Sequence, residues 1–296
     1  MAEPVIESID EVARALATND YIADAGLATA VFLALRLERP LLLEGEPGTG
    51  KSELARVISR WTGGELIRLQ CHEGIDLSQA AYEWDYPRQL LHVRVQETTG
   101  VAADRIEDGL FDERFLLRRP LLRAIEPREG PVPVLLIDEI DRADDEFEAF
   151  LLELLGDWAV TVPELGTRRA DRPPIVVITS NRTRDVHDAL KRRCLYHWID
   201  HPDVEREAAI IRLRVPAVSE ALAEHVARAT AHLRTLGLYK PPGVAEAIDW
   251  TTALTVIGMD EPDASAMDAT LGAVVKYHED LRLIRDKHGF DGLVVD

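Results

Sequence analysis

A glycine-rich stretch decides the fold of this chain: Gly45-Glu46-Pro47-Gly48-Thr49-Gly50-Lys51-Ser52. It fits the phosphate-binding pattern G-x-x-x-x-G-K-[ST], with an apolar run at 41–44 before it and an amphipathic segment from Glu53 after it. In a strand–turn–helix context the N–H groups of such a turn point at phosphate oxygens. We therefore expect residues 45–53 to bind a nucleoside triphosphate, with Lys51 reaching the β- and γ-phosphates and Ser52 ligating Mg²⁺.

Two adjacent acids, Asp138 and Glu139, follow the apolar run 134–137. An unbroken apolar run is typical of a strand that is buried on both faces of a parallel sheet. A carboxylate at the end of such a strand can hold Mg²⁺, which is the role we expect for Asp138. Glu139 is then placed to accept a proton from the attacking water. The alternative is a helix cap or a solvated turn.

Two further polar sites lie near the ends of later strands. Asn181 follows the apolar run 175–179, at the strand end where parallel sheets bind ligands, and its amide can orient a water molecule. An ordinary turn asparagine is the alternative. The basic run 191–193 precedes the apolar run 195–199. In isolation, such a run can simply be favourable charge at the end of a helix.

Composition limits the possible partners and compartment. The chain has 296 residues, 46% of them hydrophobic, and a formal net charge of −19. The charge argues against nucleic acid as a partner, although the basic clusters leave a local basic groove open. Cys71 and Cys194 lack metal-type spacing and are expected to be buried core residues. The N-terminus, Met-Ala-Glu-Pro, carries acid rather than base and lacks an apolar run, so we expect no signal peptide. We expect no membrane span, because no apolar run reaches the roughly 20 residues required, and hence a cytoplasmic protein.

The order of elements predicts an α/β fold. Strands alternate with helices up to about residue 199, and the pattern after Pro202 is helical throughout. We therefore expect a P-loop domain over 1–202, with helices flanking a central parallel sheet, and an all-helical lid domain over 203–296. The first domain should contain an insertion at about 75–95, with a strand at 91–95, and a hairpin at about 158–172. Continuous helices are expected over 114–125 and over about 264–285.

These features together resemble an AAA+ ATPase, and more narrowly the MoxR family, close to its CoxD-type branch from carbon monoxide dehydrogenase maturation. The resemblance covers nearly the whole chain and depends on the Walker A stretch 44–52, the Walker B stretch 135–139 and three further runs. These are Arg68-Leu69-Gln70-Cys71, Tyr82-Glu83-Trp84-Asp85-Tyr86 and Leu190-Lys191-Arg192-Arg193-Cys194-Leu195-Tyr196-His197-Trp198.

The resemblance implies Mg²⁺-dependent ATP hydrolysis in a homo-oligomeric ring, usually a hexamer. Lys51, Glu139 and Asn181, the last as sensor 1, would act in the chain's own site. Arg193 matches the arginine finger that completes a neighbour's site, with Arg192 as the alternative. The family also implies a partner with a von Willebrand factor A domain and a client protein or metalloenzyme. The insertion and the hairpin, with Arg168 and Arg169, match elements that face the ring pore or a partner.

The chain also departs from the wider AAA+ pattern. The segment where a sensor 2 arginine is often found reads Pro241-Pro242-Gly243-Val244-Ala245-Glu246, and Lys240 is the nearest candidate substitute. Tyr21 and Ile22 match the adenine-contacting region, although core packing is an equal alternative. A nucleotide-gated assembly module with slow hydrolysis is a second hypothesis. A nucleic-acid motor, or a GTP-using relative of the restriction ATPases, is a third.

Overall fold

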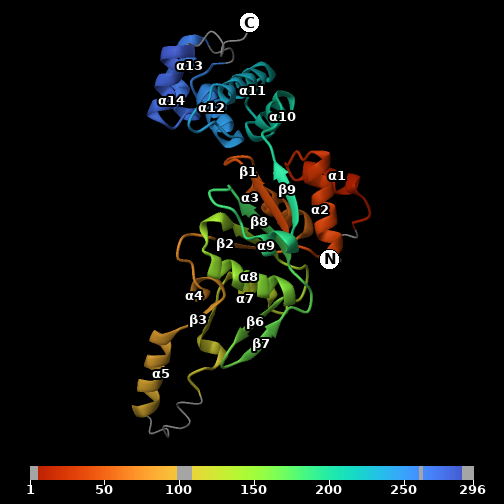
Figure 1. The fold of residues 1–296 in the computed structure, drawn as a ribbon, viewed down its shortest axis with the longest axis vertical. Helices are drawn as coiled ribbons and strands as arrows, with labels where there is room; N and C mark the ends of the chain where they lie inside the picture. The colour runs from red at the N-terminus through yellow and green to blue at the C-terminus, as the bar shows by residue number, and fades with distance from the viewer. Residues whose placement is uncertain (1–5, 99–108, 260–262, 289–296) are drawn as a thin grey trace. The chain divides into compact units, whose positions relative to one another are not determined.

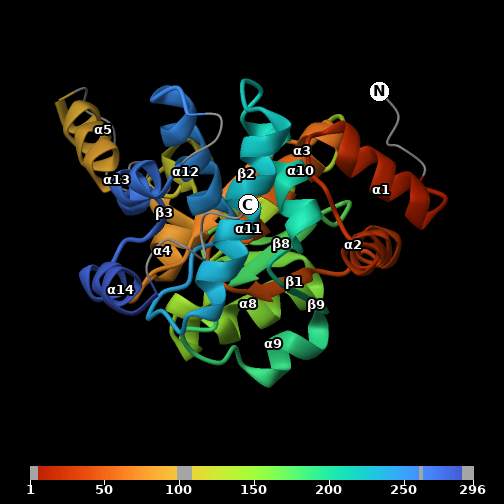
Figure 2. The ribbon, with the colours of Figure 1, turned by 90° about the horizontal axis from the view of Figure 1, so that it is seen from above.

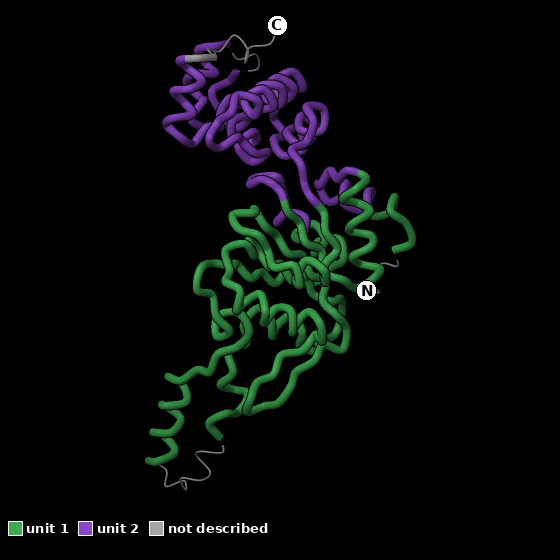
Figure 3. The backbone as a smooth tube through the Cα atoms, viewed as in Figure 1, with its two compact units in different colours: residues 1–12, 25–44, 55–197 green, residues 13–24, 45–54, 198–296 purple. Residues whose placement is uncertain are grey.

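The computed structural model describes residues 6–98, 109–259 and 263–288. The chain divides into two compact units, which are coloured separately in Figure 3. Unit 1 contains residues 1–12, 25–44 and 55–197, and unit 2 contains residues 13–24, 45–54 and 198–296. Unit 2 thus includes the glycine-rich stretch as well as the C-terminal helices. The domain boundary at residue 202 stays a prediction.

A five-stranded sheet forms the centre of the α/β part (Figure 1). Its order is β2 (Leu66–Gln70), β5 (Val134–Asp138), β8 (Ile175–Ser180), β1 (Leu41–Gly45) and β9 (Leu195–Ile199). The pairs β2–β5, β5–β8 and β8–β1 are all parallel. Every residue of β1 and β5 is buried, so both faces of the sheet are covered. The predicted parallel sheet is confirmed.

Helices and one hairpin complete unit 1. The core on one face of the sheet includes apolar side chains of the helices α7, α8 and α9. The helices are α1 (Ile9–Thr18), α2 (Ala25–Leu37), α3 (Lys51–Thr62), α7 (Pro120–Ile125), η2 (Ile140–Arg142), α8 (Asp145–Asp157) and α9 (Asp188–Arg193), with α1 and α3 each contributing residues to both units. Strands β6 (Ala159–Val162) and β7 (Gly166–Arg169) form an antiparallel hairpin within the region 158–172.

The insertion differs from its prediction. The helix α5 (Tyr86–Thr98) occupies the place where a strand was expected at 91–95, and Figure 1 shows it standing away from the sheet. The Asp85 carboxylate accepts a hydrogen bond from the Arg88 N–H and so caps this helix. The short helix α4 (Leu77–Ala80) and an antiparallel pair, β3 (Tyr82–Trp84) with β4 (Leu116–Arg118), connect α5 to the domain.

The predicted continuous helix over 114–125 is wrong in its first half. The 3₁₀ turn η1 (Glu113–Phe115) and β4 come first, and α7 begins only at Pro120. Proline fits the first turn of a helix but cannot continue one.

The C-terminal part of unit 2 is helical (Figure 2). Its elements are α10 (Val204–Arg214), α11 (Glu220–Thr235), α12 (Val244–Val256), α13 (Ala264–Val274), α14 (His278–Leu283) and the π-helical turn η3 (Ile284–His288). The fully buried Trp250 lies in their common core. The single helix expected over 264–285 is wrong, because Val275 adopts an extended conformation between α13 and α14. Among the described helices, none is both long and apolar enough to span a membrane.

Candidate functional site

The strand register gathers polar side chains at one edge of the sheet in unit 1. Gln70 pairs with Asp138 across β2 and β5, and Thr179 of β8 lies next to this pair of strands. Because the carboxyl ends of parallel strands share one edge, side chains from positions far apart in sequence meet there.

Asp138 is a buried carboxylate with both oxygens engaged. Its Oδ1 accepts from the Thr179 hydroxyl at 2.6 Å, and its Oδ2 accepts from Nε and Nη2 of Arg68 at 3.0 and 2.6 Å. The described residues contain no group of three or more His, Cys, Asp or Glu side chains able to hold a metal by themselves. A single strand-end carboxylate fits Mg²⁺, which is usually held by one or two carboxylates together with phosphate and water oxygens.

Glu139 stands at a bend of the chain. Its backbone is left-handed, with φ 57° and ψ 52°, and its N–H donates to Thr179 Oγ1 at 2.9 Å. Its Oε2 accepts from Gln70 Nε2 at 3.0 Å and pairs with Arg142 Nε at 3.0 Å. This carboxylate is only partly buried, so it combines a fixed position with access to solvent.

The turn after β8 is tied to Asp141, which is buried. Asp141 Oδ1 accepts the N–H of Asn181 at 3.1 Å, and its Oδ2 accepts the N–H and hydroxyl of Thr183 at 2.9 and 2.7 Å. Between them Arg182 has a left-handed backbone, with φ 56°. The position of Asn181 therefore depends on a carboxylate that follows Glu139 by two residues.

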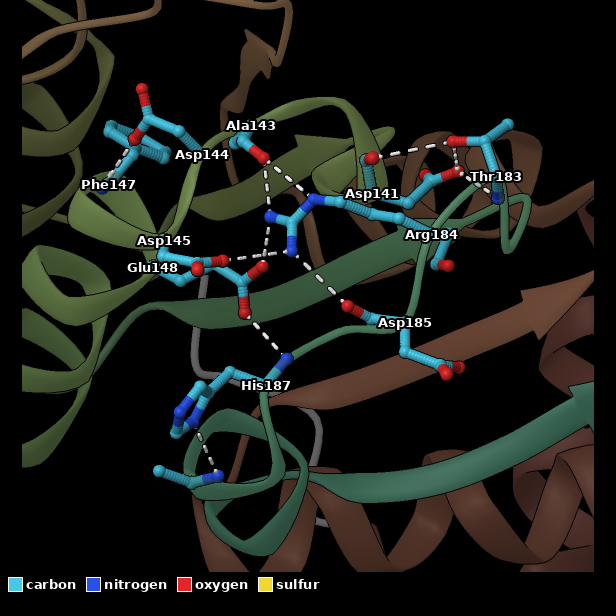
Figure 4. Close-up of polar contacts among 12 residues, drawn as sticks. Asp141, Ala143, Asp144, Asp145, Phe147, Glu148, Thr183, Arg184, Asp185 and His187 are labelled. Carbon is cyan, nitrogen blue, oxygen red and sulfur yellow. Dashed lines mark hydrogen bonds and ion pairs between the residues drawn. The ribbon is translucent and has the colours of Figure 1, made fainter.

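Beyond this turn the chain is clamped to the start of α8 (Figure 4). The Arg184 guanidinium donates to the carbonyl of Ala143 and pairs with Glu148, which is 1% exposed. The other oxygen of Glu148 accepts the His187 N–H at 2.8 Å. His187 is the N-cap of α9, whose last turn carries Arg192 and the predicted finger Arg193. The guanidinium of Arg193 donates to the carbonyl of Leu152 in α8.

The acids at this edge influence a nearby thiol. Burial, reinforced by Asp138 and the neighbouring carboxylates, raises the pKa of Cys71 to about 12. Burial likewise raises the pKa of Cys194 to about 12. Both thiols are buried, as predicted, and neither favours the thiolate form that a nucleophile needs.

The glycine-rich loop lies in unit 2, and its polar side chains donate hydrogen bonds to carbonyls of the same loop. Lys51 Nζ donates to the carbonyls of Gly45 and Glu46 at 2.7 and 2.6 Å, and the Thr49 hydroxyl also donates to Glu46, at 2.9 Å. Gly48 and Gly50 have φ of 79° and 88°, a region that glycine enters without steric cost. These are the conformations that turn successive N–H groups inward.

The proposed adenine region lies beside this loop in the same unit. The Tyr21 hydroxyl is 3.5 Å from the carbonyl of Gly50, and burial raises the pKa of Tyr21. The carbonyl of Ile22 accepts from Nε and Nη2 of Arg206 at 3.2 and 3.0 Å. Burial, aided by the positive charge of Arg234, lowers the pKa of His201 to about 4, so this imidazole is neutral near pH 7.

The segment without a sensor 2 arginine contacts the loop through its backbone. The Val244 N–H donates to the carbonyl of Gly48 at 3.1 Å, and Glu246 accepts the Gly243 N–H at 3.0 Å. A Cβ on Gly243 would lie 2.7 Å from the carbonyl oxygen of Pro47 and 2.9 Å from the Cα of Gly48. The approach is therefore possible only for glycine.

We expect Gly243→Ala to weaken ATP binding about 5- to 150-fold, because overpacking by one methyl group typically costs about 1–3 kcal/mol. Titration with a fluorescent ATP analogue measures the effect. Gly272→Ala is the matched control, because no atom lies within 4 Å of the added methyl group in the same unit. Equal affinities for the two variants would contradict the role of this contact.

Several contributing residues escaped the sequence prediction: Arg68, Gln70, Asp141, Glu148, Thr179 and Arg184. One of them carried a usable signal. Glu148 has a buried position on the apolar face of α8, beside Phe147 and Leu151. A charge at a core position requires a partner and so points to a buried polar network.

The parallel central sheet with flanking helices, followed by a helical C-terminal region, is the P-loop AAA+ fold. Residues 40–194, just over half of the chain, match the AAA domains of the dynein-related subfamily, and the chain belongs to this family. The AAA+ ATPases that contain such domains use ATP, usually with Mg²⁺, and typically form oligomeric rings.

Individual relatives share only part of their length with this chain. A 101-residue segment, 33% of the chain, is 47% identical to midasin of Giardia intestinalis and covers 2% of it. A 172-residue segment, 55% of the chain, is 27% identical to the uncharacterized protein YehL of Escherichia coli K12 and covers 42% of it. The chain thus matches less than half the length of either relative.

Among solved structures, the RuvB Holliday junction branch migration motor of Thermotoga maritima is similar, with a TM-score of 0.45 at 19% identity over 83% of this chain and 66% of that one. Its P216G mutant has a TM-score of 0.49 at 17% identity, over 98% and 73%.

Proposed function

We propose that the chain hydrolyses ATP with residues 45–53 binding the phosphates and Glu139 acting as the general base. Lys51 would exchange its loop carbonyls for phosphate oxygens, and Asn181 would orient the attacking water. Mg²⁺, held by Ser52 and Asp138, would supply charge neutralisation of the phosphates when bound. The observation that carries this proposal is the fixed, partly exposed carboxylate of Glu139, bonded to Gln70 and Arg142.

We further propose a MoxR-type role, in which the ring remodels or matures a client protein or metalloenzyme in the cytoplasm. A partner with a von Willebrand factor A domain belongs to the same proposal. The resemblance of the runs 68–71, 82–86 and 190–198 supports it. So does the helix α5, which exposes four apolar side chains suited to protein contact: Tyr86, Leu90, Leu91 and Val95.

Client capture tests this role. Glu139→Gln rings in ATP should retain a client and its partner through a pull-down, whereas Lys51→Ala rings should release both. Replacing Leu90 and Leu91 with serine should abolish capture and leave ATP hydrolysis unchanged. Capture that is independent of ATP and of α5 would contradict the remodelling role. Strong stimulation of hydrolysis by DNA, or preference for GTP, would instead favour the nucleic-acid-linked alternative that the net charge of −19 disfavours.

A nucleotide-gated assembly module is the second candidate, and the contact between Gly243 and Gly48 favours it. The segment that carries Gly243 lacks a sensor 2 arginine. Its backbone nevertheless contacts the glycine-rich loop, and so connects the C-terminal helices to that loop. Under this hypothesis ATP and a non-hydrolysable analogue would release the client equally well. Release that requires hydrolysis would exclude the second candidate.

A further inference from the structure

The six-residue helix α9 is anchored at both ends by side chains from elsewhere in unit 1. We propose that Glu148 and Arg39 are positioning residues that aim the basic last turn of α9 at a neighbouring subunit's site. This inference rests on the proposed function, in which Arg193, or alternatively Arg192, serves as the finger. It adds the residues that determine where the finger stands.

Glu148 anchors the N-terminal end of α9. Its carboxylate is buried and divided between two donors, the Arg184 guanidinium on Oε1 and the His187 N–H on Oε2 at 2.8 Å (Figure 4). Arg184 is itself fixed to the carbonyl of Ala143 at 2.9 Å and to Asp145 at 3.2 Å. A buried charge with its hydrogen bonds filled has little freedom to move, so the N-cap of α9 is fixed to the first turns of α8.

Arg39 anchors the C-terminal end. Its guanidinium donates to three consecutive carbonyls, those of Arg192 at 2.9 Å, Arg193 at 3.2 Å and Cys194 at 3.2 Å. The last carbonyls of a helix lack partners within the helix, and a cation there is favourable. Arg39 lies just after α2, so this second anchor comes from a part of unit 1 that is distant in sequence.

These anchors matter because α9 is too short to define its own position. A helix of six residues is not stable alone, and tertiary contacts set where it lies. An arginine that stabilises developing charge must be placed closely, and a misplacement of about 1 Å can lower a rate about 10²-fold. The turn 181–187 begins at Asn181 and ends at the N-cap of α9. A single segment therefore connects the chain's own site to the arginine proposed for a neighbour's site.

The hydrogen bond from the His187 N–H to Glu148 can be isolated by comparing two variants. His187 has φ −58° and ψ 134°, and this φ is one that proline adopts without strain. His187→Pro therefore removes the N–H that Glu148 accepts. His187→Ala is the matched control, because it keeps that N–H but, like proline, removes the imidazole that accepts from the Ala189 N–H at 3.2 Å.

The proline variant should have a kcat about 10- to 100-fold below that of the alanine variant, with the KM for ATP within about twofold. Equal kcat values in two folded variants would overturn the inference. Arg39→Ala removes the other anchor, at a partly exposed position, and should also lower kcat while leaving the KM for ATP within about twofold. If the proline variant does not fold, the Arg39→Ala variant tests the inference in its place.

Mixed rings separate positioning from general damage. His187→Pro subunits have intact residues 45–53 and Glu139, so mixing them with Glu139→Gln subunits should restore about a quarter of the wild-type rate by pairing two intact half-sites. Mixing them with Arg192→Ala/Arg193→Ala subunits should restore nothing, because both lack a working finger. Recovery in the second mixture, or none in the first, would overturn the inference. If the double arginine variant itself fails to complement Glu139→Gln, the trans finger of the proposed function is wrong instead.

Discussion

Replacing Glu139 with glutamine should leave ATP binding intact and lower turnover about 10²- to 10⁴-fold, which is the usual contribution of a positioned general base. Glutamine keeps the shape of the side chain and an acceptor oxygen. The bonds from Gln70 Nε2 and Arg142 Nε, each 3.0 Å, can therefore persist. What is lost is the basicity that removes a proton from water. Steady-state phosphate release gives kcat, and a fluorescent nucleotide titration gives the affinity.

Glu146→Gln provides the control for the lost charge. Glu146 is exposed in the first turn of α8, seven residues along the chain from Glu139, and its replacement should leave kcat within about twofold, since surface substitutions rarely act strongly. Unchanged turnover in Glu139→Gln would show that another group accepts the proton. A parallel loss of ATP affinity would show that Glu139 shapes the binding site rather than the chemical step.

The sheet was predictable because its central strands are continuous apolar runs. A strand that is apolar throughout must be buried on both faces of its sheet. The structure places two such runs, 134–137 and 175–179, as neighbours in a parallel sheet. The prediction of a strand at 91–95 is wrong. Leu91, Val93 and Val95 alternate with polar residues in the sequence, as in a strand, but they lie on the helix α5, whose surface is largely exposed. The overlooked signal was local, namely the capping Asp85 followed by a proline near the helix start.

The candidate site was predictable only in its motif residues. Asp138 and Glu139 follow an apolar strand, and Asn181 follows another, so their position at a strand end is visible in the sequence. Their partners are not. Gln70 meets Glu139 because β2 pairs with β5 in one register, across 68 intervening residues, and no local pattern encodes a parallel register. The roles of these residues stay predictions.

Buried acids connect the site to its supports. Asp141 and Glu148 lie two and nine residues beyond Glu139, and each fixes the turn after β8 at a different point. Asp141 holds the end that carries Asn181, and Glu148 holds the end that begins α9. Because both carboxylates come from one segment, a displacement of η2 or the start of α8 would reach the water-orienting amide and the finger helix together.

Asp141→Asn should lower kcat about 10²-fold without changing the KM for ATP, since a small misplacement of a water-orienting group has effects of this size. The amide of asparagine has one acceptor oxygen. It cannot accept both the Asn181 N–H at 3.1 Å and the Thr183 N–H at 2.9 Å from opposite sides. Loss of one of these part-buried hydrogen bonds to a carboxylate should also reduce the free energy of unfolding by about 1.5–3 kcal/mol. ATPase kinetics and chemical denaturation measure the two effects.

A second substitution separates the loss of stability from the loss of activity. Arg182, between the two bonded residues, has a left-handed φ of 56°, which costs a non-glycine residue about 1–2 kcal/mol. Arg182→Gly in the Asp141→Asn background should therefore recover roughly 1 kcal/mol of stability. It should not recover kcat, because glycine restores no acceptor for the Asn181 N–H. If activity returned together with stability, Asp141 would only support the fold, and the position of Asn181 would have to be set by the bond from the Arg182 N–H to Ser180 Oγ at 3.1 Å.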